Sequence, residues 1–145
     1  MSKGPEKVEN MVSGLRKWQA IERKAMDATA EIMERTDSAL IRMVMEIIRH
    51  DSLMHHRVQQ FIIDSLTREN VSITRDDLGA IWESIEAHDQ AEKEIVALGE
   101  ELSKTAWTPV QKQLLAYLVT DEKKHDVLLE TLNDIKRDLT KSSGA

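Results

Sequence analysis

Two short stretches of this chain carry ionisable side chains at spacings that would bring them together at one site. Asp51 and His55 stand four positions apart, and the same pair recurs 70 positions later as Asp121 and His125. Residues four apart are neighbours on one face of a helix. Both pairs interrupt a helical pattern of apolar residues, so we expect their side chains to face an interior. Carboxylates and imidazoles in an interior are typical of a site for iron, manganese or zinc.

Three glutamates complete the set of candidate ligands. Glu22 and Glu92 are also 70 positions apart, and Glu122 lies three positions before His125. Buried carboxylates repel one another and resist leaving water. A cluster of them beside histidines would therefore be costly without a cation. The pattern predicts one or two bound ions of iron, or alternatively of manganese or zinc.

Four predicted helices position these residues, because apolar residues recur along the chain at alternating steps of three and four. The helices are expected at residues 5–35, 38–66, 74–104 and 109–139, with a tail at 141–145. Thr36, Asp37 and Ser38 are the candidate N-caps of the second helix and Thr108 is the expected N-cap of the fourth, and Thr74 with Asp77 resembles a capping box. Short connectors favour antiparallel neighbouring helices. Residues 1–145 should form a single domain. We expect an all-α fold, an antiparallel up-down-up-down four-helix bundle.

The chain also repeats itself internally. A shift of 70 positions without gaps matches the apolar faces of the first two helices to those of the last two. The Glu, Asp and His matches are more specific, because charged residues are rare on such faces. We therefore expect two similar helical hairpins whose polar groups meet near the middle of the bundle. Gly99 would allow close helix approach. His88, which matches Trp18, is expected to be a packing residue, with an extra metal ligand as the alternative.

Composition excludes several classes of function. The length of 145 residues suits about one domain. A net charge of −6 offers no basic surface for nucleic acid or an anionic membrane. The absence of cysteine excludes disulfides and thiolate metal sites, and no apolar run reaches the roughly 20 residues of a membrane span. We expect a cytoplasmic protein with no nucleic-acid or membrane partner.

The arrangement of these residues resembles the ferritin-like superfamily, which includes rubrerythrins and other di-iron carboxylate proteins. In that pattern two helices each supply one Glu and the other two each supply Glu-x-x-His. Glu22 and Glu92 match the lone glutamates, and residues 122–125 match the full motif. On the second helix His55 is present, but Ser52 occupies the glutamate position. The resemblance covers nearly the whole chain in architecture and five of the six expected ligands.

The resemblance implies a metal site with the following ligands: Glu22, His55, Glu92, Glu122 and His125. Asp121 would orient a histidine from outside the metal's own ligand set. Asp51 would do the same, or would replace the missing ligand. A serine hydroxyl is a poor substitute for a chelating carboxylate. With Ser52 at this position, two outcomes stay open. The protein has one tight metal site beside a weak or empty one, or the whole site is degenerate.

Two functions follow, and the sequence does not decide whether the protein is an enzyme. The first is oxidase or peroxidase-type redox chemistry with O₂ or peroxide, with electrons from a redox partner protein because no cysteine-ligated electron-transfer domain is present. The alternative is a non-enzymatic helical interaction module with a metal-free or degenerate polar core, in which Asp51 pairs with His55 and Asp121 with His125. Iron storage is a third hypothesis. Whether the chain forms homo-oligomers stays open.

Overall fold

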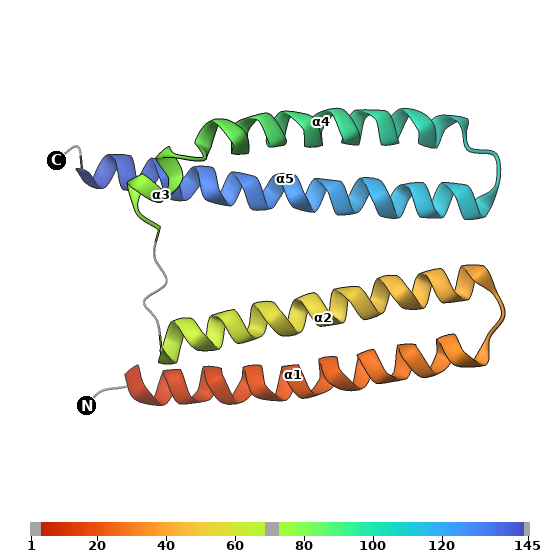
Figure 1. Cartoon of the computed structure of the whole chain (residues 1–145), viewed down its shortest axis with the longest axis horizontal. Coiled ribbons are helices and arrows are strands. Elements are labelled where there is room, and N and C mark those ends of the chain that lie inside the picture. Colours follow the sequence, from red (N-terminus) through yellow and green to blue (C-terminus); the bar gives the residue numbers. More distant parts are fainter. Residues whose placement is uncertain (1–3, 69–72, 144–145) are drawn as a thin grey trace. The chain divides into compact units, whose positions relative to one another are not determined.

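The computed structural model describes residues 4–68 and 73–143, and the side chains of these residues as far as 139. All regular secondary structure in this part of the chain is helical, which confirms the predicted all-α class. The helices are α1 (Gly4–Arg35), α2 (Ala39–Thr67), α3 (Arg75–Gly79), α4 (Trp82–Thr105) and α5 (Pro109–Ser143), in that order along the chain (Figure 1). No helix within the described residues has the length and apolar content needed to cross a membrane.

Side-chain caps begin three of the helices, two at the predicted Thr74 and Thr108 and one at Ser38, which is one of the three candidates. The Ser38 hydroxyl accepts a hydrogen bond from the backbone N–H of Ile41 at 3.2 Å. The Thr108 hydroxyl accepts one from Gln111 at 3.1 Å, directly before Pro109 begins α5. Thr74 and Asp77 form the complete capping box at the start of α3. Each cap satisfies backbone donors that a helix start otherwise leaves unpaired.

The predicted third helix, 74–104, is in fact two helices. α3 ends at Gly79, a residue with little preference for helix. The backbone N–H of Ile81 then donates to the carbonyl of Leu78 at 3.2 Å, a tighter turn than an α-helix makes. Leu78 is buried, and α3 contacts α5. The break therefore lets a short helix dock its apolar side chain, while α4 continues in a new direction.

The chain divides into two compact units, Met1–Val71 and Ser72–Ala145. In the first unit α1 packs against α2, and we call this pair the first hairpin. In the second unit α4 packs against α5, with α3 also on α5, and we call this the second hairpin. Each hairpin is described by itself below. The four-helix bundle and the single domain remain predictions.

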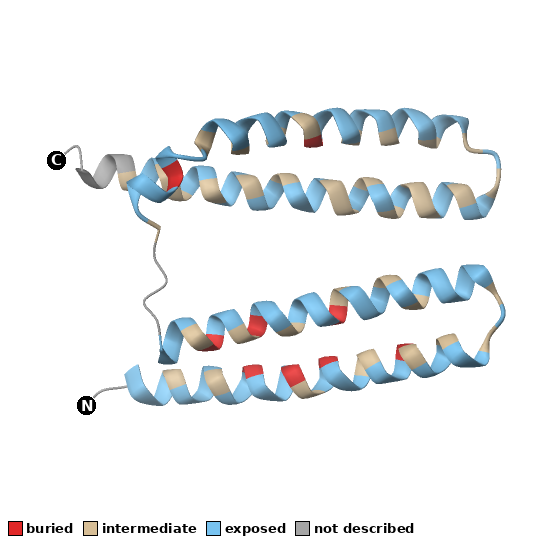
Figure 2. Ribbon diagram, viewed as in Figure 1, coloured by how far each residue is buried: buried red, intermediate tan, exposed pale blue. Residues whose placement is uncertain are grey.

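Few apolar side chains are fully buried within either hairpin. Among the described side chains these are Leu15 and Ile63 in the first hairpin and Leu78 in the second. Polar residues share the buried positions, which lie where α1 and α2 face each other and where α4 faces α5 (Figure 2): Gln19, Glu22, Thr29, Ser52, Gln59 and Glu92. Many large apolar side chains stay exposed, so each hairpin presents apolar surface that a stable protein normally covers.

Gly99 permits close contact between α4 and α5. A Cβ atom at this position would lie 2.7 Å from the Val119 side chain, closer than atoms in contact normally approach. The predicted close helix approach at Gly99 is therefore confirmed. It lies about two turns of α4 beyond Glu92, so it helps to hold the polar residues of α4 near those of α5.

Candidate metal centre

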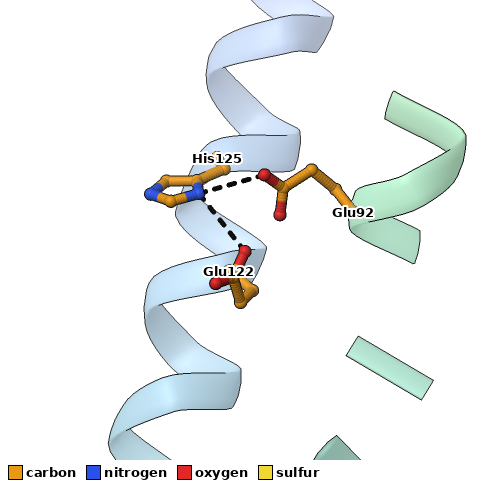
Figure 3. Close-up of side chains that lie close together, drawn as sticks. All are labelled: Glu92, Glu122 and His125. Carbon is orange, nitrogen blue, oxygen red and sulfur yellow. Dashed lines mark hydrogen bonds and ion pairs between the residues drawn. The ribbon is translucent and has the colours of Figure 1, made fainter. Parts of the chain in front are cut away.

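Three of the predicted ligands come together in the second hairpin. Glu92 on α4 faces Glu122 and His125 on α5, and each offers a ligand atom within 4.8 Å of the other two (Figure 3). Nδ1 of His125 lies 3.3 Å from Oε1 of Glu92 and 3.3 Å from Oε2 of Glu122. Glu122 and His125 share one face of α5 because they stand three positions apart. Two helices therefore supply two carboxylates and one imidazole to a single point.

Burial differs across this cluster in a way that suits binding. Glu92 is buried, with 5% of its side chain exposed, whereas 45% of the His125 side chain is exposed. Glu122 is half-buried. The cluster thus has a closed side at α4 and an open side at the histidine. An ion from solvent can reach the carboxylates without unfolding of the hairpin.

The charges of the three groups are strongly linked. A hydrogen bond with Glu92 raises the pKa of Glu122, and burial and the negative charge of Glu92 act in the same direction. The same hydrogen bond lowers the pKa of Glu92 against the opposing effect of burial. Burial alone would lower the pKa of His125, but the carboxylates of Glu92, Glu122 and Asp121 outweigh it and raise the pKa. The cluster therefore favours added positive charge, which a proton or a metal cation can supply.

One carboxylate oxygen in the cluster is unsatisfied. Oε2 of Glu92 is buried, and when Glu122 is ionised this oxygen has no hydrogen-bond partner among the described residues. Such groups are rare in folded proteins because leaving them unpaired costs free energy. A bound cation would satisfy this oxygen. Two carboxylates and an imidazole are also a donor set that iron, manganese and zinc accept, so the residues fit such a metal.

Two further side chains contact the cluster from its edge. Oδ2 of Asp121 lies 3.7 Å from Nε2 of His125, the ring nitrogen that does not face the glutamates. This is the position from which a carboxylate orients a ligand histidine. His88 is not packed in the interior as predicted. Its side chain is 61% exposed, and its Nε2 lies 2.9 Å from Oε1 of Glu92, because the two residues stand one turn apart on α4.

The first hairpin repeats part of this arrangement. Glu22 is buried, and its Oε1 lies 3.4 Å from Nδ1 of His55, close to the corresponding distance between Glu92 and His125. Trp18, one turn before Glu22, donates its Nε1–H to the same oxygen at 3.1 Å. The 70-residue repeat of the sequence is thus also a repeat of side-chain geometry.

Ser52 marks the difference between the hairpins. It is buried in the first hairpin at the position that matches Glu122 in the second. Asp51 is half-buried, and within residues 4–68 no ion pair joins it to His55, whose partner is Glu22. The predicted pairing of Asp with the His four positions later is therefore found for Asp121 and His125 but not, within the described residues, for Asp51 and His55.

Polar residues directly beside the predicted faces also pair between helices, although the apolar pattern gave no indication of them. Gln19 is buried and donates to the backbone carbonyl of His56 at 3.3 Å, although His56 falls outside the predicted face. Asp89 and Asp126 occupy the matching positions of the second hairpin, where a hydrogen bond between them raises the pKa of Asp126 and lowers that of Asp89. The 70-residue repeat contained this signal, since both pairs recur at the same shift.

Comparison of the chain with protein-family models, with curated proteins and with solved structures found no match in any of the three.

Proposed function

We propose that this chain is a ferritin-like metal-binding protein that uses iron or manganese for redox chemistry with O₂ or peroxide. The observation that carries the proposal is the convergence of Glu92, Glu122 and His125 within 4.8 Å. The buried Oε2 of Glu92 supports it, because this oxygen lacks a partner when Glu122 is ionised and a bound cation can supply one.

The proposal includes packing of the two hairpins into one antiparallel four-helix bundle. Support comes from exposed apolar residues on the same helical faces as the candidate ligands. On α2 these are Ile41, Val44, Ile48, Val58 and Ile62, and in the second hairpin they are Ile95, Leu102, Leu118 and Leu128. His55 lies within the α2 series and His125 within the α5 series. Packing these apolar faces of the two hairpins against each other would place Glu22 and His55 beside the cluster of the second hairpin.

Each ligand has a defined task in this proposal. Glu92, Glu122 and His125 would hold the tighter ion, with both glutamates ionised. Glu22 and His55 hold a weaker second ion, because Ser52 supplies no carboxylate. When bound, such ions supply the electron transfer to O₂ or peroxide. The chain contains no cysteine for an electron-transfer centre of its own, so the electrons would come from a partner protein.

The alternative is a non-enzymatic helical interaction module with a polar, metal-free core. The interior of the first hairpin favours it, since Gln19, Ser52 and Gln59 are neutral and buried there. In that case the ion pairs of Glu22 with His55 and of Glu92 with His125 would fix the helix register without a metal.

An anaerobic titration with ferrous iron tests the first proposal. Metal-free protein is loaded with Fe²⁺, O₂ or peroxide is added, and oxidation is followed by near-ultraviolet absorbance. Glu122→Gln removes one ligand charge at nearly constant shape, so we expect at least about tenfold weaker binding and loss of oxidation. Glu130→Gln, at an exposed position about two turns along α5, is the matched control and should behave as wild type. Absence of binding by wild type overturns the proposal, and binding without oxidation removes its redox part.

A further inference from the structure

The helix α2 carries a second apolar stripe, distinct from the face that holds His55. Its members are Met43, Ile47, Met54 and Phe61. Met43, Met54 and Phe61 are all exposed, and Ile47 is half-buried. At about 100° per residue, Met43 and Phe61 point roughly 180° away from Ser52, which is buried in the hairpin. We call these four residues the outer stripe.

The outer stripe is also turned away from the face proposed to meet the second hairpin. Val44 and Ile62 lie at the centre of that face, and Met43 and Phe61 lie about 100° further round the helix. A helix in a four-helix bundle buries the sector between its two neighbours and leaves the opposite sector to solvent. The outer stripe falls in that opposite sector. Its apolar side chains would stay exposed in the bundle.

The internal repeat shows that the fold does not require this stripe. The matching positions of α5, 70 residues later, are Gln113, Tyr117, Lys124 and Thr131. Three of these four are polar side chains, and none is aliphatic. A helix in the same place in the second hairpin therefore has an ordinary solvent-facing surface. The apolar residues of α2 serve something outside the hairpin.

The charges beside the stripe indicate what covers it. Glu46 and Arg57 lie on one flank of the stripe, on the side away from His55, about 20° apart around the helix. If a second α2 packs antiparallel across a twofold axis, this flank meets the same flank of the other copy. Glu46 then faces Arg57 of the second copy, in both directions, while Met43 faces Phe61. A parallel pair would place these charges against the apolar flank, so the charge pattern selects the antiparallel arrangement.

We propose that two copies of this chain form a twofold dimer through the outer stripe of α2. Apolar contact supplies the attraction, and the two pairs of Glu46 with Arg57 set the direction and register. The surface lies on a different face of α2 from His55, so the dimer and the metal site are separate properties.

Matching positions of the two hairpins provide a control. Met54 belongs to the outer stripe and is 51% exposed, whereas Thr131 is an exposed polar residue of α5 that matches Phe61. Sedimentation velocity over a concentration series should show a wild-type dimer, at least about tenfold weaker association in Met54→Lys, and wild-type association in Thr131→Lys. A wild-type monomer at about 100 μM, or a dimer unaffected by Met54→Lys, overturns the proposal. Circular dichroism establishes that each variant is folded.

Charge reversal tests the antiparallel register. Glu46→Arg and Arg57→Glu should each weaken the dimer, because like charges then meet at two places. The double variant Glu46→Arg/Arg57→Glu should restore it. A double variant as weak as the single ones overturns the register.

Cross-linking gives an answer that does not depend on weakening the contact. The chain has no cysteine, so Met54→Cys and Thr131→Cys each introduce one reactive thiol. A short bis-maleimide should join two copies of Met54→Cys and not two copies of Thr131→Cys. Equal cross-linking of both variants, or of neither, contradicts the proposed interface.

Discussion

The substitution Ser52→Glu tests why the two hairpins differ. Ser52 is 6% exposed and matches Glu122, while Glu22 on the facing helix is 8% exposed. In the second hairpin the corresponding groups approach within 4.8 Å. The substitution should therefore add the missing carboxylate beside Glu22 and His55 and create in the first hairpin the donor set that the second already has.

The expected cost follows from that separation. Two like charges 4.8 Å apart, at the effective dielectric constant of about 20 that suits protein sites, repel by about 3 kcal/mol. The metal-free variant should lose this much stability, or about 10 °C in melting temperature for a chain of this size. Ser52→Gln adds the same bulk without the charge, so the difference between the two variants isolates the repulsion.

Thermal unfolding is measured in a chelator and again with Mn²⁺ or Zn²⁺. In chelator Ser52→Glu should melt below Ser52→Gln by the amount above. Saturating metal should remove this difference in melting temperature, because the bound cation neutralises the carboxylates, and the second ion should bind more tightly to Ser52→Glu than to wild type. If the two variants have the same melting temperature under both conditions, the side chain at position 52 does not reach Glu22. The assignment of α2 ligands is then wrong.

Two further predictions concern the helix contacts. Gly14→Ala should raise the free energy of unfolding by about 1 kcal/mol in chemical denaturation, since a Cβ there meets nothing within 4 Å. Gly99→Ala should lower the free energy of unfolding by about 1–2 kcal/mol, because its Cβ would contact Val119. An equal rise in both variants would contradict the close approach of α4 and α5. Hydrogen bonding with Asp89 raises the pKa of Asp126, so the stability that protonated Asp126 contributes is present in acid and is lost as the pH rises through its raised pKa. Asp126→Asn should therefore raise the melting temperature at about pH 7 and much less at about pH 4, and an equal rise at both would contradict this.

The features that could be predicted from sequence are those with local causes. The caps at Ser38, Thr74 and Thr108 depend on neighbouring residues alone, and the structure has them at those positions. The break after Gly79 could not be predicted in the same way, because it depends on docking of Leu78 in the second hairpin, a contact distant in sequence.

The candidate site shows the same division. Glu122 and His125 share a face by their spacing, and their meeting with Glu92 followed from the repeat. The face of α1 that meets α2 could not be predicted from the sequence. Trp18, on the predicted face, is 54% exposed, while its neighbour Gln19 is buried. A single turn of helix offers several candidate faces, and only the packing of a whole hairpin selects one.

The metal content of the purified protein tests the central claim most directly. Protein made without a histidine tag and purified without chelator is measured by elemental analysis, together with Glu92→Ala and His125→Ala. We predict one tightly held equivalent of iron, manganese or zinc per wild-type chain, lost in both variants. A folded, metal-free wild type that cannot be loaded with any of these ions would contradict the account.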